Sequence, residues 1–182
     1  MSAATLPALG LAAPVGARPT GPDASAEAKL WAACWPTARL GEALGALARH
    51  GAGRTQAHAH APALADAPTL PPALESGPAE EQGRWLQWAA ARLGLEAEPV
   101  DTPVPQAATL LCAAGPALLQ LRTPQGPGLA LLLGRRGRWL RLLGPDGRVQ
   151  RCAPEALRAA LCAPFEAPLR PGIIDLLDAA QV

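Results

Sequence analysis

The fold of this chain is decided by residues 115–161, which read GPALLQLRTPQGPGLALLLGRRGRWLRLLGPDGRVQRCAPEALRAAL. Three apolar runs and one alternating run lie within this stretch, at 117–121, 129–133, 138–143 and 148–152. Pro and Gly, the residues that interrupt regular structure most strongly, fill the gaps between the runs. The pattern predicts a small antiparallel sheet whose strands are joined by tight turns.

The place of each strand in the sheet follows from its side-chain pattern. Residues 129–133 do not alternate, which indicates a central strand buried on both faces. Residues 148–152 alternate, which indicates an edge strand. Residues 134–137 are expected to form a turn, because the glycines at both ends can take positive φ. Arg138 and Arg141 are expected to reach solvent.

Helical patterns surround the strands in the sequence. Spacing and end signals predict a short strand at 95–100 and helices at 26–35, 38–50, 79–93, 106–114 and 171–180, with a further helix that opens at Pro154. Thr37 is expected to cap the helix at 38–50, and Gly51 to end it. Helices, then strands, then helices again are typical of an α+β domain.

The domain organisation follows from composition. Residues 1–24 are rich in Ala, Pro and Gly without a period, and we expect a disordered tail. One α+β domain is expected at 25–170, with a flexible Pro- and Ala-rich loop at 52–79. Residues 171–182 are expected to form a C-terminal helix or linker.

Composition also limits the partners and the compartment. A net charge of +1 argues against nucleic acid as a main partner. The uncharged stretch 102–121 is interrupted by Pro103, Pro105 and Pro116, which argues against a membrane span. The N-terminus lacks the pattern of a signal peptide, and the four cysteines form no Cys-x-x-Cys pair. Together these features indicate a reducing cytoplasm and free thiols.

The histidines offer one possible metal site. His58 and His60 would share a face on a strand, and Asp66 is the nearest carboxylate. A metal site needs more ligands than this group supplies, so we predict neither a bound metal nor a cofactor.

Cys34 is the candidate nucleophile. It stands just before a helix expected to begin near Thr37, and a helix N-terminus can lower the pKa of a thiol. A thiol hydrolase also needs a histidine base and an orienting partner. A buried, inert thiol is the alternative, and the pattern favours it.

Two charged groups have ordinary explanations. Residues 134–138 contain Gly and Arg, which are common in phosphate-binding loops. They lack the Gly-Lys-Ser/Thr of a P-loop, so a solvated hairpin turn is expected. Asp175 and Asp178 are expected to lie on a solvated helix face.

Residues 85–161 resemble the second half of a family C39 peptidase domain, the papain-like domain at the N-terminus of many bacterial exporters for bacteriocins and other peptides. The resemblance rests on residues 86–95 for a helix ending in Leu-Gly-Leu, 96–100 for the following strand, 115–121 for a Pro-Ala-Ile strand, 128–133 for the histidine strand and 142–147 for an Asp-Pro-x-x-Gly turn. The helix at 38–50 resembles the long helix after the catalytic cysteine. The resemblance implies a papain-like arrangement, with the helical N-terminal half packed on the sheet.

The catalytic positions of that family are occupied by other residues here. Leu129 stands where the family has its histidine, and Gly144 where it has its aspartate. Thr37 or Ala38 falls near the cysteine position, while Cys34 is displaced by about one helical turn. The upstream oxyanion glutamine has no counterpart. The resemblance therefore implies a domain without a catalytic set.

Three functional hypotheses stay open at this stage. The first is a non-catalytic domain of an ABC-type exporter that holds or docks a leader peptide or an exported protein. Its other partners would be the membrane and ATPase regions of the transporter, and it would lie in the cytoplasm or be tethered to the cytoplasmic face of the inner membrane. Any peptide groove is expected between the helical half and the sheet.

The other two hypotheses do not need an exporter. One is an active thiol peptidase that uses Cys34 with one of the three histidines, which are His50, His58 and His60. The other is a stand-alone protein-interaction adaptor whose contact surface is built from tryptophans, which are Trp31, Trp35, Trp85 and Trp88.

Overall fold

The computed structural model describes residues 22–52, 67–75 and 77–180 of the chain. In chain order, its helices and strands are α1 (Pro22–Ala32), β1 (Trp35–Pro36), η1 (Thr37–Arg39), α2 (Leu40–Ala52), α3 (Pro72–Glu75), α4 (Ala79–Arg92), η3 (Val104–Gln106), α5 (Ala107–Ala113), β2 (Ala117–Thr123), β3 (Gly126–Arg136), β4 (Trp139–Leu143), β5 (Val149–Cys152), α6 (Pro154–Glu166) and α7 (Arg170–Ala179). The chain has a mixed α+β fold with a curled antiparallel sheet, which confirms the predicted class.

The sheet is built around β3. β2 pairs with it from Ala117↔Leu132 to Thr123↔Gly126. β4 pairs with it through Leu131↔Leu143, and β1 through Trp35↔Leu129. A position on β3 has one neighbour on each edge, so β1 and β4 share the edge opposite β2. The central place of β3 and the edge place of β5 are confirmed.

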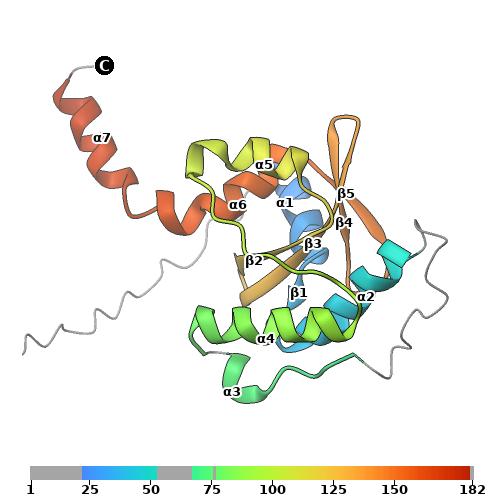
Figure 1. Ribbon diagram of the computed structural model, residues 1–182. Helices are drawn as coiled ribbons and strands as arrows, with labels where there is room; N and C mark the ends of the chain where they lie inside the picture. Colours follow the sequence, from blue (N-terminus) through green and yellow to red (C-terminus); the bar gives the residue numbers. More distant parts are fainter. Residues whose placement is uncertain (1–21, 53–66, 76, 181–182) are drawn as a thin grey trace, which may run out of the picture.

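Each face of the sheet carries its own apolar core. Leu129, Leu131 and Leu133 pack with α2 and α4 in what we call the α2–α4 core. Ala130 and Leu132, which alternate with them, pack with α1, α5 and α6 in the α1–α6 core. Figure 1 shows α4 and α2 on one side of the strands, and α5 and α6 on the other. Burying a leucine contributes about 2 kcal/mol, so the apolar run of β3 fixes the sheet between two helical layers.

The N-terminal elements differ from the prediction. The helix expected at 26–35 ends at Ala32, and Trp35 lies in β1. Pro36 disfavours helical backbone at the residue before it. The indole Nε1 of Trp35 also donates a 2.7 Å hydrogen bond to the carbonyl oxygen of Leu143, which holds Trp35 against the end of β4.

The ends of the next helix were also predicted wrongly. Gly51 does not end α2, which continues to Ala52. Thr37 does not cap it, because η1 begins at Thr37 and Pro36 takes the capping position without a side-chain hydrogen bond.

Two predictions for the strand region were wrong. Residues 95–100 form no strand. Leu95 packs on the α2–α4 core, and Pro99 has no N–H to donate to a ladder. Gly134 belongs to β3 rather than to a turn. It has φ +114° at an irregularity in the β3–β4 register, where its Cα lies so close to Gly115 that a Cβ on Gly115 would be 2.7 Å away.

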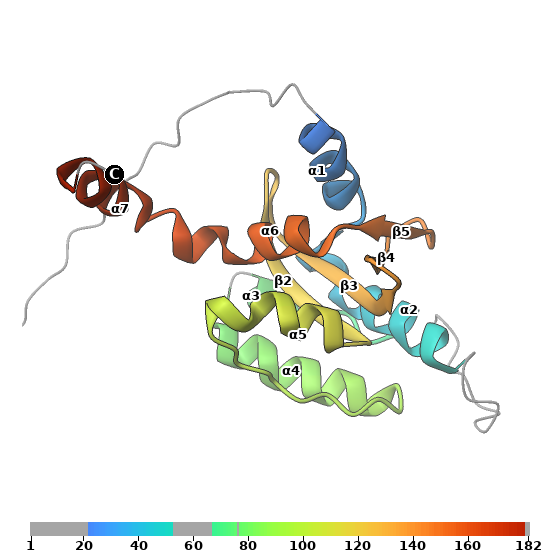
Figure 2. The same cartoon turned by 90° about the horizontal axis from the view of Figure 1, so that it is seen from above.

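α7 lies away from the body of the protein (Figure 2). None of its residues is buried, and Ile173, Leu176 and Leu177 are exposed. Asp175 and Asp178 are exposed too, as predicted. Among the helices of the described residues, none combines the length and the apolar content that crossing a bilayer requires.

Candidate functional site

A cleft lies beside the first residues of β2, the strand whose second edge is unpaired among the described residues. Its volume is about 680 Å³, and its lining comes from α2, α4, segment 95–100, α5, β2 and α6. We call it the β2 cleft. α4 and α5 lie on either side of β2 in Figure 1. We expected a peptide groove between the helical half and the sheet; the β2 cleft has α4 on one side, as expected, but also reaches α5 and α6.

The β2 cleft reaches both faces of the strand. Leu118 packs toward the α2–α4 core, whereas Ala117 and Leu119 pack toward the α1–α6 core. All three residues line the cleft. The cleft therefore wraps around the edge of β2 instead of lying on one face of the sheet.

The wall of the β2 cleft is apolar and its lining charges are mainly acidic. Glu80, Glu96 and Glu98 line it and are exposed. Arg84 is the basic residue of the lining, and its guanidinium lies 3.9 Å from the carboxylate of Glu80. Both partners of that pair are solvated, so it contributes little to stability. The net charge along this lining is negative.

A smaller cavity of about 200 Å³ adjoins the β2 cleft. It shares Gly83, Leu86 and Leu118 with the cleft, so the two spaces are neighbours. Thr37 from η1 and Leu129 from β3 line only the smaller space, which we call the Thr37 cavity.

Thr37 carries a buried hydroxyl at the start of η1. Its side chain is 8% exposed, and its Oγ1 has no hydrogen-bond partner among the described residues. Buried hydroxyls are usually paired, since burial without a partner costs about 1–3 kcal/mol. η1 leads directly into α2, so Thr37 lies at the N-terminal end of a long helical stretch.

Two glutamines form the polar side of the Thr37 cavity. Gln82 on α4 donates through Nε2 to the carbonyl oxygen of Leu74, at 2.7 Å. Gln120 on β2 donates through Nε2 to Oε1 of Gln82, at 3.5 Å. Gln120 lies opposite Leu129 in the β2–β3 register. The Thr37 cavity is thus polar on one side and apolar on the other.

Of the positions that the resemblance compares with a catalytic set, which are Thr37 or Ala38, Leu129 and Gly144, the structure brings Thr37 and Leu129 together. Thr37 and Leu129 line the same cavity. Gly144 does not line it; it follows Leu143, whose carbonyl oxygen accepts the hydrogen bond from the indole of Trp35. Thr37, Leu129 and Gly144 therefore all lie near β1, but only Thr37 and Leu129 line the Thr37 cavity.

Cys34 lies on the other side of the sheet. It packs against the α1–α6 core, while Thr37, Leu129 and α2 belong to the opposite side. Its Sγ donates to the carbonyl oxygen of Leu30 at 3.3 Å. Burial, followed by the nearby Cys152 thiol, raises the pKa of Cys34 to about 11. Cys34 is therefore a protonated thiol near neutral pH.

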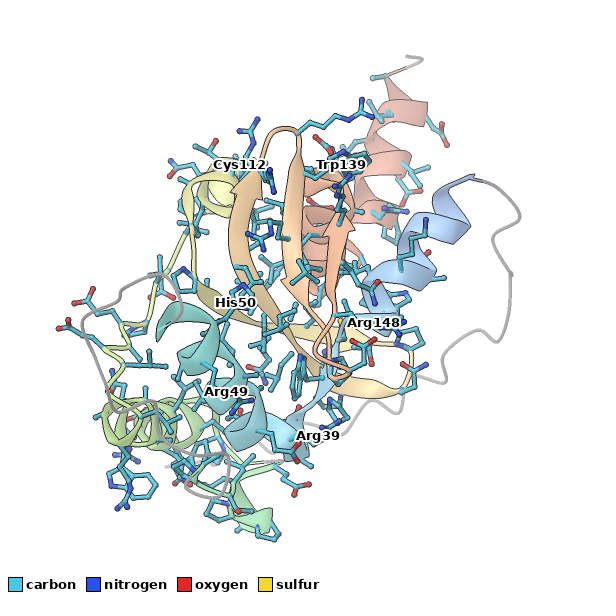
Figure 3. The ribbon with its side chains drawn as sticks, turned by 90° about the vertical axis from the view of Figure 1, so that its right-hand side faces the viewer. Arg39, Arg49, His50, Cys112, Trp139 and Arg148 are labelled. Carbon is cyan, nitrogen blue, oxygen red and sulfur yellow. The ribbon has the colours of Figure 1, made fainter. Side chains whose placement is uncertain are left out.

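The histidines do not assemble a site in the described part of the chain. His50 lies in the last turn of α2. Figure 3 labels it, together with Arg39 of η1, which precedes the other end of that helix. His58, His60 and Asp66 lie outside the described residues. Among the described residues, no cluster of three or more His, Cys, Asp or Glu side chains is arranged to hold a metal ion.

The tryptophans have different surroundings. Trp35 is buried, and Trp85 packs on the α2–α4 core. Trp88 is 52% exposed. Its ring contacts Trp85, at 6.4 Å between centroids, and the guanidinium of Arg92, which lies 5.4 Å from the ring centroid.

Sequence reasoning did not single out Gln82, Gln120 or Gly83. Gln120 follows the alternation of β2, which places it on the same face as Leu118, and that signal was visible in the sequence. Gln82 and Gly83 line the Thr37 cavity only because α4 packs on the sheet, and the local sequence pattern of α4 does not predict that packing.

Comparison with protein-family models, with curated proteins and with solved structures found no match.

Proposed function

We propose that the chain is a non-catalytic, peptidase-like domain in a papain-like, C39-like arrangement. It acts with an ABC-type exporter, where it holds a leader peptide or an exported protein, or docks it on the transporter. The observation that carries the proposal is the convergence of Thr37 and Leu129 on one cavity that adjoins the β2 cleft. The resemblance assigns Leu129 to the histidine position, and Thr37 or Ala38 to the cysteine position.

The chemistry at this convergence supports binding rather than catalysis. A leucine at position 129 has no group that accepts a proton, and a threonine hydroxyl without a base is a weak nucleophile. Cys34, with its raised pKa and its place on the opposite core, is a poor substitute. The site keeps a buried polar group, Thr37, next to an apolar cleft suited to holding a chain.

The exporter assignment rests on the sequence resemblance. It gives the domain the membrane and ATPase regions of a transporter as partners, and a position at the cytoplasmic face of the inner membrane. Fractionation of native cells tests this part. A membrane-bound product several times heavier than 18.6 kDa supports the assignment, and a product of 18.6 kDa away from the membrane contradicts it.

Peptide holding is tested by isothermal titration with a synthetic leader that ends in a double glycine. The Gly83→Phe variant fills the shared part of the β2 cleft and the Thr37 cavity, since a Cβ at Gly83 meets nothing within 4 Å. Gly172→Phe on α7, where a Cβ also meets nothing, is the matched control. We expect the wild-type chain and Gly172→Phe to bind the leader, and Gly83→Phe to lose at least about tenfold in affinity. Equal binding by all three would contradict the proposal.

A stand-alone adaptor is the second candidate. The exposed ring of Trp88, backed by Trp85 and Arg92, favours it, because exposed aromatic residues often anchor protein interfaces. A native product of 18.6 kDa that stays away from the membrane would move this function to first place.

A further inference from the structure

We infer that β2 takes up an extended, apolar peptide with basic ends as an additional strand of the sheet. The inference rests on the proposed peptide-holding function and specifies its mode: main-chain pairing along β2, with side chains of the peptide entering the β2 cleft on both sides of the strand.

The backbone of β2 has a free edge. Ala117–Thr123 pairs with β3 along its whole length, and in the described ranges β3 is its one strand neighbour. In a strand paired on one side, alternate N–H and C=O groups point to the other side and remain available to a further strand. Segment 95–100 lines the cleft but forms no ladder with β2.

The side chains around this edge suit an alternating peptide. Successive side chains of a strand point to opposite faces of the sheet. A peptide paired with β2 would send alternate side chains toward Leu86 and Leu118 on one face, and toward Leu110 and Leu119 on the other. All four residues line the same cleft. A cleft confined to one face of the sheet would receive only half of the side chains of such a peptide.

A bound helix fits this cleft less well. Its backbone groups are already paired within the helix, so it would leave the free edge of β2 without partners. Strand addition satisfies that edge and lets the cleft select the side chains.

The charges of the lining select the ends of the peptide. The lining carries three carboxylates, those of Glu80, Glu96 and Glu98, and one guanidinium, that of Arg84. Opposite charge on a partner increases the association rate and excludes like-charged competitors. Lysine or arginine at the ends of the peptide therefore complements the cleft, whereas acidic ends do not.

The experiment uses hydrogen exchange of the full chain, followed by NMR, with a synthetic probe. The probe has about six residues, the usual length of a strand, with apolar residues at alternate positions and lysine at both ends. We expect new protection at alternate amides within Ala117–Thr123. Alternate N–H groups of the bound probe should donate to β2. N-methylation of the residues that carry these groups should weaken binding about tenfold, and N-methylation of the residues between them should leave binding unchanged.

The charge argument has its own variants. Glu96→Lys with Glu98→Lys should weaken binding of the lysine-ended probe by about fivefold and strengthen binding of a glutamate-ended probe. Asp178→Lys on α7 is the control and should change neither affinity. All three side chains are exposed, so these variants leave the core intact.

The possible outcomes separate the two claims. Peptide binding that protects other residues but no β2 amide overturns strand addition and leaves peptide holding in place. Failure of both the probe and the double-glycine leader to bind overturns both. Binding with unchanged affinity in the Glu96→Lys, Glu98→Lys variant overturns the preference for basic ends.

Discussion

Thr37 is the buried polar residue whose hydroxyl has no hydrogen-bond partner in the described structure. Replacing it by valine keeps the shape of the side chain and removes the desolvation penalty of the hydroxyl. We expect Thr37→Val to raise the free energy of unfolding by about 1 kcal/mol, measured by urea denaturation. Thr109→Val, at an exposed position on α5, should change it by less than about 0.5 kcal/mol. A clear loss of stability in Thr37→Val would mean that the hydroxyl is paired in solution.

The thiols of Cys34 and Cys152 give the protein a pH dependence in the alkaline range. Burial raises the pKa of both from 9.0 to about 11, so the folded state favours the neutral thiols. This stability is fully present below pH 9 and is lost as the pH rises toward 11. We expect the thermal midpoint to fall over this range. The fall should be shallower in a Cys34→Ala, Cys152→Ala variant, and an equally steep fall in that variant would contradict the assignment.

The same raised pKa predicts the reactivity of Cys34. Alkylation of this thiol by iodoacetamide, followed by peptide mass analysis, should be slow at neutral pH and should accelerate through about pH 11. Fast labelling at neutral pH would restore the thiol peptidase hypothesis.

Two of the glycines of α2, Gly41 and Gly45, have opposite surroundings and provide a matched pair of tests. A Cβ at Gly41 would lie 1.7 Å from the carbonyl oxygen of Pro68, whereas at Gly45 its nearest contacts are at 3.4 Å. Gly41→Ala should therefore force α2 away from segment 67–70 and destabilise the fold by several kcal/mol. Gly45→Ala should stabilise it by about 0.5–1 kcal/mol, because alanine is the better helix former. Chemical denaturation of both variants measures the contrast, and equal effects would refute the close contact with Pro68.

Strand positions were predicted well where the signal is local. β3, β4 and β5 lie within a few residues of the predicted runs, since apolar runs and Pro- and Gly-rich turns fix them. β1 was missed because its pairing joins Trp35 to Leu129, far apart in the sequence. The predicted strand at 95–100 was wrong because the local pattern fits a loop as well as a strand, and among the described residues this segment pairs with no strand.

At the scale of the whole molecule, α7 contributes no buried residue. A chain shortened to end at Ala167 should therefore keep the stability of the full chain within about 0.5 kcal/mol. It should also bind less of an apolar dye, because Leu169, Ile173 and Leu176 are more than half exposed. A large loss of stability on shortening would show that α7 packs on the body in solution.

The candidate site was only partly visible in the sequence. The resemblance named the substituted positions Leu129 and Gly144, and Thr37 or Ala38 for the cysteine. The structure groups Thr37 with Leu129 and leaves Gly144 outside the cavity. The β2 cleft depends on how α4 and α5 pack around one strand edge, and such tertiary packing leaves no periodic signal in the sequence.

The central claim is that the Thr37 cavity corresponds to a peptidase site that has no catalytic cysteine and histidine. The most direct test is to introduce these two side chains. In a Thr37→Cys, Leu129→His variant, the new thiol and imidazole would line one cavity of about 200 Å³. If this cavity is a peptidase site without its catalytic set, the imidazole should lower the pKa of the thiol. The variant should then react with iodoacetamide at neutral pH much faster than Thr37→Cys alone, with native folding checked by circular dichroism. Equal rates in two folded variants would contradict the account.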